Sequence, residues 1–251
     1  MRSRHPSLSC CHTLVPPVNH TRVNATTGLR RRLEGVSPVD VVNDLFAAKA
    51  KHFTAQYGVF DLYVTANAPR VGVSSELLVL VRGDVAQSGV LCRVSSACIT
   101  STALGSIECE CALQLDAALA RIDAVDQGVL IYLTDQEGRG QGLTTKVRAL
   151  ANKNQGFDTF EAVEELGLDA DVRSYEAVPA ILDALGVRSI QLLTGNPDKQ
   201  HALARAGVSV DGIESLAVEP NTWARRSLQA KQARGHTVVG RYVDDPLERY
   251  P

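Results

Sequence analysis

Three of the chain's six cysteines lie close together in the stretch CITSTALGSIECECALQ, as Cys98, Cys109 and Cys111. A cysteine thiolate is a strong zinc ligand, and a site with three protein ligands keeps a fourth tetrahedral position for water. The C-x2-C pairs of structural four-ligand cages are not found here, so the spacing favours a catalytic zinc site. A fourth ligand from His201 or His236 would instead make the site structural. The alternative to a metal site is that the three cysteines are small buried core side chains, because free cysteine packs as a hydrophobe.

A second set of residues suited to chemistry lies in YLTDQEGRGQGL and the residues after it, which follow an apolar stretch. Three alternating glycines allow close backbone approach. The charged residues there are Glu137, Arg139, Lys146 and Arg148. Ligands bind beyond the carboxyl ends of strands in such layouts, so the stretch predicts phosphate or base recognition. A turn with a solvated charged face is the alternative, since a G-x-G-x-G loop alone is a weak signal.

Both sets need a scaffold, and the apolar pattern predicts one. Strands are predicted at 76–85, 89–96, 128–134 and 189–194. Helices are predicted at 37–53, 111–125, 174–187 and 198–207. This alternation indicates an α/β or α+β fold. Cys109 and Cys111 then lie at a strand-to-helix junction, with Cys98 about one hairpin away, and all three can converge.

The composition narrows the class of protein. With 251 residues, of which 45% are hydrophobic and 22% charged, the chain matches a globular protein with a sizeable core. The net charge of -2 and the pI of about 6.3 argue against a bulk nucleic-acid or membrane-surface binder. The longest apolar runs are too short to span a bilayer. No signal-peptide pattern is present, so a cytoplasmic protein with free or metal-bound thiols is expected.

Three parts are predicted along the chain. Residues 1–35 have the composition of a flexible basic tail, with a run of three arginines and little apolar pattern. Residues 36–240 form the expected main domain, and residues 241–251 a C-terminal tail. The cysteines outside the cluster have no predicted role; they are Cys10, Cys11 and Cys92.

Together the two clusters resemble one family, GTP cyclohydrolase II, the zinc enzyme that opens GTP at the start of riboflavin synthesis. The matching segments occur in the family's order, over roughly residues 76–236. They are RVSSAC (93–98), GSIECECALQLDAAL (105–119), YLTDQEGRGQGL (132–143), NQGFDTFEA (154–162), LGLDADVRSY (166–175), LLTGNPDK (192–199) and, more weakly, PNTWARRSLQAKQARGH (220–236). The resemblance implies a mixed sheet flanked by helices, with residues 36–240 as the zinc domain.

The resemblance also implies a role for each matching residue. Cys98, Cys109 and Cys111 would be the zinc ligands. Asp171 would be the proton acceptor, and Arg173 the nucleophile that takes a phosphoryl or nucleotidyl group as diphosphate leaves. An ordinary Asp–Arg surface pair is the alternative, because a guanidinium stays protonated. The implied nucleotide contacts are Arg93, Val94, Ser96, Gln114 (which would read the base), Glu137, Gly138, Arg139, Thr159, Thr194 and Lys199.

The implied reaction opens the imidazole ring of GTP at C8 and releases formate and diphosphate, to give a 2,5-diamino-6-ribosylamino-pyrimidinone phosphate. One zinc ion (Zn²⁺) per chain would serve the hydrolysis, and Mg²⁺ would offset the triphosphate charge with help from Lys199 and Arg139. The implied partner is a small-molecule nucleotide, with neither nucleic acid nor membrane. A homodimer is expected from the resemblance.

Several residues depart from the family's pattern near the metal and the base. Ser95 and Ala97 replace a histidine and a glutamate, and Glu108 replaces an arginine, which reverses a charge. Glu110 stands between the last two cysteines, where aspartate is usual. Leu150 replaces a tyrosine implicated in completing the reaction, and leucine can neither donate nor accept a hydrogen bond.

These departures leave alternatives open. A diverted member of the family would stop at the formamide product, or open another purine or pyrimidine nucleotide. A protein of another class, a zinc-containing nucleotide-binding subunit without turnover, would carry the same ligands. The presence of the three cysteines together with Asp171 and Arg173 argues for a working enzyme. Release of formate separates the enzyme from the binding subunit.

Overall fold

The computed structural model of the chain describes residues 45–66, 72–73 and 75–239. The strands are β1 (Phe46–Phe53), β2 (Val59–Thr65), β3 (Leu78–Arg82), β4 (Val90–Ser96), β5 (Gly128–Leu133), β6 (Ile190–Leu193) and β7 (Val210–Glu214). The helices are α2 (Ile99–Thr102), α3 (Cys111–Val125), the 3-10 turn η2 (Glu137–Gly140), α4 (Gly142–Asn154), α5 (Glu161–Glu164), α6 (Ala177–Ala184), α7 (Pro197–Arg205) and α8 (Thr222–Ala233). Within these ranges no helix is both long and apolar enough to cross a membrane. The predicted tails, with Cys10 and Cys11, lie outside the described residues.

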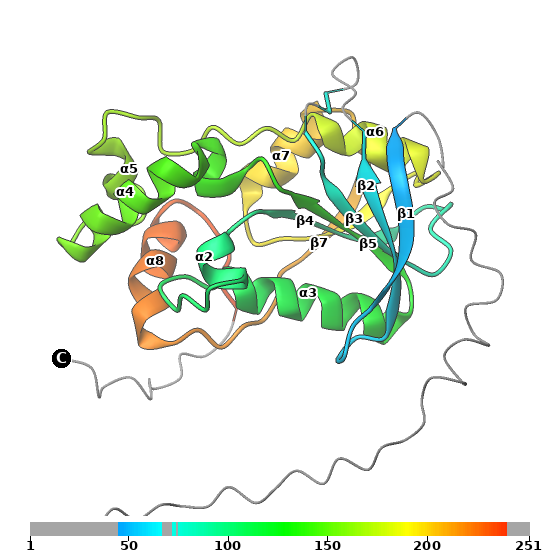
Figure 1. Ribbon diagram of the computed structural model, residues 1–251, viewed down its shortest axis with the longest axis horizontal. Coiled ribbons are helices and arrows are strands. Elements are labelled where there is room, and N and C mark those ends of the chain that lie inside the picture. The colour runs from blue at the N-terminus through cyan, green and yellow to red at the C-terminus, as the bar shows by residue number, and fades with distance from the viewer. Residues whose placement is uncertain (1–44, 67–71, 74, 240–251) are drawn as a thin grey trace, which may run out of the picture. The chain divides into compact units, whose positions relative to one another are not determined.

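The seven strands form one mixed sheet in the order β1-β2-β3-β5-β4-β6-β7 (Figure 1). Neighbours from β1 through β3 to β5 are antiparallel, whereas β5, β4, β6 and β7 run parallel. The predicted fold class is confirmed, since helices flank this mixed sheet. The predicted strands at 76–85 and 89–96 follow one another along the chain, but β5 separates them in the sheet.

Helices cover both faces of the sheet because its central strands are apolar on both sides. Ile131 of β5 belongs to one core cluster, together with Ile181 of α6 and Leu203 of α7. Leu130, the preceding residue of β5, points to the opposite face and packs in a second cluster with Ile122 of α3. Figure 1 shows the result, with α6 and α7 on one side of the sheet and α3 on the other.

The helix predicted at 37–53 is wrong where the structure describes it, because residues 46–53 form the edge strand β1. Its alternating alanine and lysine residues suit a helix, but pairing with β2 overrides that propensity. Phe46 is buried against Tyr63 of β2, with ring centroids 4.9 Å apart. Two lysines of β1 also form ion pairs with Asp61 across the hairpin. The first part of the predicted helix lies outside the described residues.

The carboxyl ends of β4, β5 and β6 lie at the same end of the sheet because these strands are parallel. The chain passes from β4 into α2, from β5 into η2 and α4, and from β6 into α7. Figure 1 shows α2, α4 and α8 gathered beyond this end of the sheet. Ligands bind outside the carboxyl ends of strands in sheets of this kind, so this end is where a functional site is expected.

Candidate functional site

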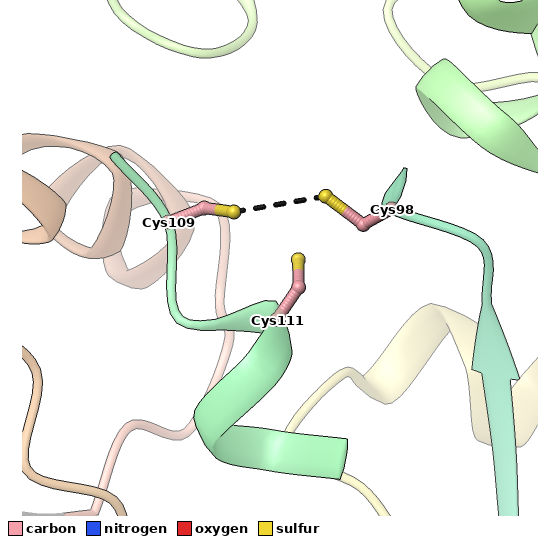
Figure 2. A group of neighbouring side chains, drawn as sticks. All are labelled: Cys98, Cys109 and Cys111. Carbon is pink, nitrogen blue, oxygen red and sulfur yellow. Dashed lines mark hydrogen bonds between the residues drawn. The ribbon is translucent and has the colours of Figure 1, made fainter. Parts of the chain in front are cut away.

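The three cysteine sulfur atoms converge where β4 ends and α3 begins (Figure 2). All three Sγ atoms lie within 4.8 Å of one another, and Sγ of Cys98 is 3.8 Å from Sγ of Cys109. Cys98 precedes α2, and Cys111 is the first residue of α3. The predicted convergence is therefore confirmed, but α2 and a loop make the connection in place of the predicted hairpin.

The cluster has the donor set of a metal site with an open position. Among the described residues its ligand atoms are the three sulfurs, and no nitrogen of His201 or His236 belongs to the group. Thiolates are soft ligands that zinc prefers, and tetrahedral zinc with three protein ligands leaves one position for water. The residues present therefore fit a zinc ion.

The electrostatics of the cluster favour a bound cation. Hydrogen bonds with Cys109 and Cys111 hold the pKa of the Cys98 thiol well below its usual range, and the Lys146 ammonium, with Nζ 3.2 Å from Sγ of Cys98, acts in the same direction. The pKa of Cys111 is raised by its hydrogen bonds with the other two thiols and by burial. The Cys98 thiolate is thus easily formed and the Cys111 thiolate is not, and a divalent cation between the sulfur atoms would stabilise the charge of both.

Cys92 differs from the three clustered cysteines. It lies in the hydrophobic core on β4, and burial raises the pKa of its thiol to about 12. A thiol in this environment behaves as a small apolar side chain. The prediction that Cys92 is a strand residue is confirmed.

The cysteines form part of the wall of a cavity whose charged lining is mainly basic. The basic side chains are Arg93, Arg139, Lys146, Lys153, Arg173, Lys199 and Lys231, and the acidic ones are Glu108 and Glu110. A concave wall with an excess of one charge concentrates the electrostatic potential and attracts ligands of the opposite charge. The cavity therefore suits an anionic ligand that lies next to the metal site.

Three buried polar atoms on this wall have no hydrogen-bond partner among the described residues. They are Nε of Arg93, Oγ of Ser96 and Oε2 of Glu110. Buried polar groups in folded proteins are almost always paired, so unpaired ones that face a cavity indicate a polar ligand or ordered water. The three atoms offer a donor, a hydroxyl and an acceptor, which suits a ligand with both kinds of group.

Most of the predicted nucleotide-contacting residues line the cavity: Arg93, Ser96, Gln114, Gly138, Arg139, Thr159, Thr194 and Lys199. Val94 and Glu137 are not among its lining residues. The carbonyl oxygen of Val94 accepts a hydrogen bond of 2.6 Å from Nζ of Lys199. The carboxylate of Glu137 accepts from the backbone N–H groups of Ile99 and Gly138 at 2.7 and 3.0 Å. Both residues thus support the wall of the cavity through hydrogen bonds.

The glycine-rich loop owes its glycines to backbone geometry. Gly138 and Arg139 both have left-handed conformations, with φ of 60° and 59°. A Cβ atom on Gly140 would lie 3.0 Å from the carbonyl oxygen of Val172, so the close approach here is made by the protein's own chain. The turn directs the guanidinium of Arg139 to Thr159, whose carbonyl oxygen and Oγ1 each accept a hydrogen bond of 3.0 Å.

Asp171 and Arg173 form a close ion pair, and Arg173 lines the cavity whereas Asp171 does not. Nε of Arg173 donates to both carboxylate oxygens of Asp171, at 2.9 and 3.1 Å. Burial opposes charge on both groups, but their hydrogen bonds outweigh it, so the pKa of Arg173 is raised and the pKa of Asp171 is lowered. Both groups are therefore charged in the resting protein.

The residues that depart from the family's pattern also line the cavity: Ser95, Ala97, Glu108 and Leu150. Leu150 lies on α4 between Lys146 and Lys153, and the spacing of these three residues puts them on one face of the helix. Nζ of Lys153 donates to the carbonyl oxygen of Glu108 at 3.3 Å. The departures thus change the chemistry of the cavity wall itself.

Helix α8 supplies part of the cavity wall. None of its residues is among the site residues predicted from the sequence. Lys231 on this helix forms an ion pair with the buried carboxylate of Glu110. Arg234, which follows α8, stacks on Phe160, and Arg139 stacks on the same ring; each guanidinium carbon lies 3.9 Å from the ring centroid. The signal for this wall in the sequence is the last and weakest of the matching segments.

His236 adds a pH-dependent term to the stability of this wall. Burial, followed by the charges of Lys231, Arg173 and Arg139, lowers its pKa from 6.5 to about 4. The folded protein therefore holds the imidazole neutral, whereas the unfolded chain takes up a proton as the pH falls below 6.5. We expect the free energy of unfolding to decrease as pH falls from 6.5 towards about 4, and His236→Gln to remove part of this decrease. Urea denaturation of both proteins at about pH 7.5 and about pH 4.5 measures the effect, and equal losses would contradict it.

Comparison with known proteins confirms the resemblance. The family model described as GTP cyclohydrolase II matches residues 47–215. GTP cyclohydrolase-2 of Hahella chejuensis is 40% identical over 191 residues, which are 75% of this chain and 90% of that protein. The riboflavin biosynthesis protein RibBA of a Synechocystis species is 38% identical over 195 residues, 76% of this chain but 34% of that protein.

Among solved structures, RibBX, a two-domain 3,4-dihydroxy-2-butanone 4-phosphate synthase from A. baumannii, has a TM-score of 0.38 and 17% identity over 74% of this chain and 43% of that chain. A TM-score this low does not establish a shared fold. Sheet, cavity and cysteine cluster define a mixed α/β protein with a candidate metal centre on the wall of a mainly basic cavity. The chain belongs to the GTP cyclohydrolase II family, a family of enzymes.

Proposed function

We propose that this protein is a zinc-dependent GTP cyclohydrolase II, which opens the imidazole ring of GTP and releases formate and diphosphate. The observation that carries the proposal is the convergence of three cysteine sulfur atoms on the wall of a basic cavity. The sulfur atoms suit a hydrolytic metal centre, and the basic wall suits a triphosphate. Membership of the family supports GTP as the substrate and ring opening as the reaction.

Cys98, Cys109 and Cys111 would hold one zinc ion per chain. A zinc ion held by these residues would lower the pKa of a bound water molecule to about 7, and would so supply a nucleophile at neutral pH. Lys146 supports the site from α4, because its ammonium group, 3.2 Å from Sγ of Cys98, offsets the charge of the thiolates. The base would lie with its C8 atom towards this centre.

The triphosphate would lie against the basic side chains of the wall, with Mg²⁺ offsetting the remaining charge. Lys199 is buried, and burial together with the charges of Arg93 and Arg173 holds its pKa well below its usual range. A phosphate group beside this lysine would favour its charged form, so substrate binding and protonation of Lys199 would reinforce each other. The half-buried guanidinium of Arg139 would contribute from η2.

Asp171 and Arg173 would act on the phosphates. A charged guanidinium on the cavity wall is suited to binding phosphate oxygens in a two-pronged geometry. For Arg173 to act as a nucleophile, Asp171 has to take a proton from it. The raised pKa of Arg173 and the lowered pKa of Asp171 both oppose this transfer in the resting protein. We therefore assign Arg173 to phosphate binding first, with Asp171 as the residue that holds it.

Incubation of the zinc-loaded protein with GTP and Mg²⁺ tests the proposal. We expect stoichiometric formate, diphosphate and the diaminopyrimidine phosphate that begins riboflavin synthesis, each measured by mass spectrometry or coupled assay. Dialysis against a chelator should abolish formate release, and added zinc should restore it. Unchanged GTP would contradict the proposal. A product that keeps its formyl group would show that the reaction stops at the formamide, which is the diverted outcome considered for a chain with Leu150 in place of a tyrosine.

A further inference from the structure

Glu110 is a buried carboxylate with one oxygen left free. It lies between two of the clustered cysteines, directly before α3, and its residue is 1% exposed. Oε1 accepts hydrogen bonds from Nζ of Lys231 and, at 3.3 Å, from Nε2 of Gln114. Oε2 is buried on the cavity wall and has no partner among the described residues.

An unpaired carboxylate oxygen in this position calls for a donor in the ligand. A buried polar atom without a hydrogen bond is strongly unfavourable, and more so when it carries charge. Lys231 already supplies one cation to the carboxylate, so a neutral N–H or O–H donor suits the second oxygen better than another cation would. Because Cys109 and Cys111 flank Glu110 in sequence, a base held at the metal centre lies within reach of this oxygen.

The neighbouring side chains fix the carboxylate, and the part of the chain that the structure describes offers Oε2 no partner. Gln114, one turn further along α3, uses its amide nitrogen on Glu110 and its amide oxygen on Arg93, whose NH2 group donates at 2.9 Å. Arg93 in turn donates from its NH1 group to the carbonyl oxygen of Leu193 at 2.9 Å. The chain of contacts from α8 through α3 to β4 and β6 therefore holds Oε2 in one place.

We infer that Glu110 is a specificity-determining residue, whose free Oε2 atom accepts hydrogen bonds from the N–H groups on the pyrimidine-ring edge of guanine, and that Lys231 positions it. This inference rests on the proposed function. Guanine presents two neighbouring donors on that edge, the N1–H and the 2-amino group, which match a carboxylate acceptor. Adenine carries an acceptor at N1 and hypoxanthine lacks the 2-amino group, so both leave the acceptor less satisfied.

Four nucleotides and one substitution test the role of Glu110. On the wild type, kcat/KM for GTP should exceed that for inosine triphosphate by about 10- to 100-fold. In Glu110→Gln, the amide oxygen can still accept the hydrogen bond from Lys231. The amide nitrogen then replaces Oε2, so that a donor faces the N–H donors of guanine. Xanthosine triphosphate has a carbonyl oxygen in place of the 2-amino group, so the variant should shift the ratio of GTP to xanthosine triphosphate towards the latter by about 100-fold. Deoxy-GTP, which lacks the 2′-hydroxyl, should keep its wild-type ratio to GTP.

The inference would be overturned if Glu110→Gln kept the wild-type ratios of kcat/KM for GTP to those for inosine triphosphate and xanthosine triphosphate. It would also be overturned if the wild type had equal kcat/KM for GTP and inosine triphosphate. A change confined to deoxy-GTP would place the donor on the ribose and would also overturn it. A general loss of packing lowers all rates together and leaves these ratios unmoved, so the ratios separate recognition from stability.

Lys231 is tested as a positioning residue by the same ratios. Lys231→Met should reduce the preference for GTP over inosine triphosphate by about 10-fold, and Lys231→Arg, which keeps the charge, should restore most of it. Arg226→Met, which removes a positive charge from an exposed position on the same helix, is the matched control and should leave the ratio unchanged. Wild-type preference in Lys231→Met would remove Lys231 from the inference.

The proposed function and this inference fail in different ways. A zinc-loaded wild type that leaves GTP unchanged contradicts the proposed function. Calorimetric dissociation constants of the four nucleotides on that same protein still give the recognition ratios. If these constants do not distinguish GTP from inosine triphosphate, the inference fails, whether or not turnover occurs.

Discussion

Cys111→Ser is expected to leave the protein without bound zinc and to lower kcat for GTP hydrolysis by at least about 1,000-fold. The three Sγ atoms lie within 4.8 Å of one another, so each one supplies a third of the ligand set found among the described residues. A serine hydroxyl stays protonated and binds zinc poorly, and two remaining thiols no longer form a site for it. Zinc content by atomic absorption and formate release, measured on the same preparation, check both parts of the expectation.

Cys92→Ala is the matched control, because it removes a thiol from the same strand that leads to the site. This variant should keep its zinc and its kcat, and should lose about 1 kcal/mol of stability through lost packing. A Cys111→Ser protein with full zinc content and an unchanged rate would contradict the metal assignment. Loss of zinc in both variants would point to general unfolding, and circular dichroism separates the two cases.

Arg173→Ala is expected to lower kcat/KM for GTP by about 1,000-fold while leaving one zinc ion per chain in place. The guanidinium is charged, lines the cavity and is held at two points by Asp171, so its removal takes a pre-oriented phosphate ligand out of the wall. Arg173→Lys keeps the charge but loses the two-pronged geometry, and about 10- to 100-fold of the rate should be lost. Steady-state kinetics with zinc analysis measures these effects.

The Asp171 partner gives the second arm of this test. Asp171→Asn should also reduce turnover with zinc retained, because the guanidinium loses the carboxylate that holds it. Asp169→Asn, at an exposed position two residues away, should leave the rate unchanged. Wild-type rates in Arg173→Ala and Asp171→Asn would exclude both residues from the mechanism. Zinc loss in either variant would show that the effect reaches the cysteines.

The sequence predicts an element well where the spacing of its apolar residues matches the face that the element buries in the fold. The helix predicted at 111–125 is present with the same bounds, because its apolar spacing faces the sheet and Asp126 ends it with a left-handed φ of 54°. The apolar run at 128–134 forms β5, which is buried on both faces. By contrast, β1 has a composition that suits a helix, and only its pairing with β2 makes it a strand. Sequence patterns do not contain such pairing information.

The candidate site divides in the same way. Cys98, Cys109 and Cys111 are close in sequence, so their spacing alone predicts that they bind one metal ion together. The ion pair between Glu110 and Lys231 joins residues 121 positions apart. The sequence around neither residue contains a pattern that predicts it. Helix α8 is largely polar, with only Ala224, Ser227 and Leu228 buried, and it supplies Lys231 to the cavity wall. Its part in the site follows from tertiary contacts that a single sequence does not show.

The position of α8 in the chain has a consequence for how the protein matures. Synthesis proceeds from the amino terminus, and domains begin to fold as they emerge. All seven strands and the three cysteines precede α8, so the sheet and the thiol trio can assemble before the lysine that pairs with Glu110 has been made. During that interval the cavity lacks the part of its lining that α8 supplies, which includes Ser227, Leu228 and Lys231. The cavity wall, and with it the ion pair of Glu110, is therefore completed only after the rest of the described domain has been synthesised.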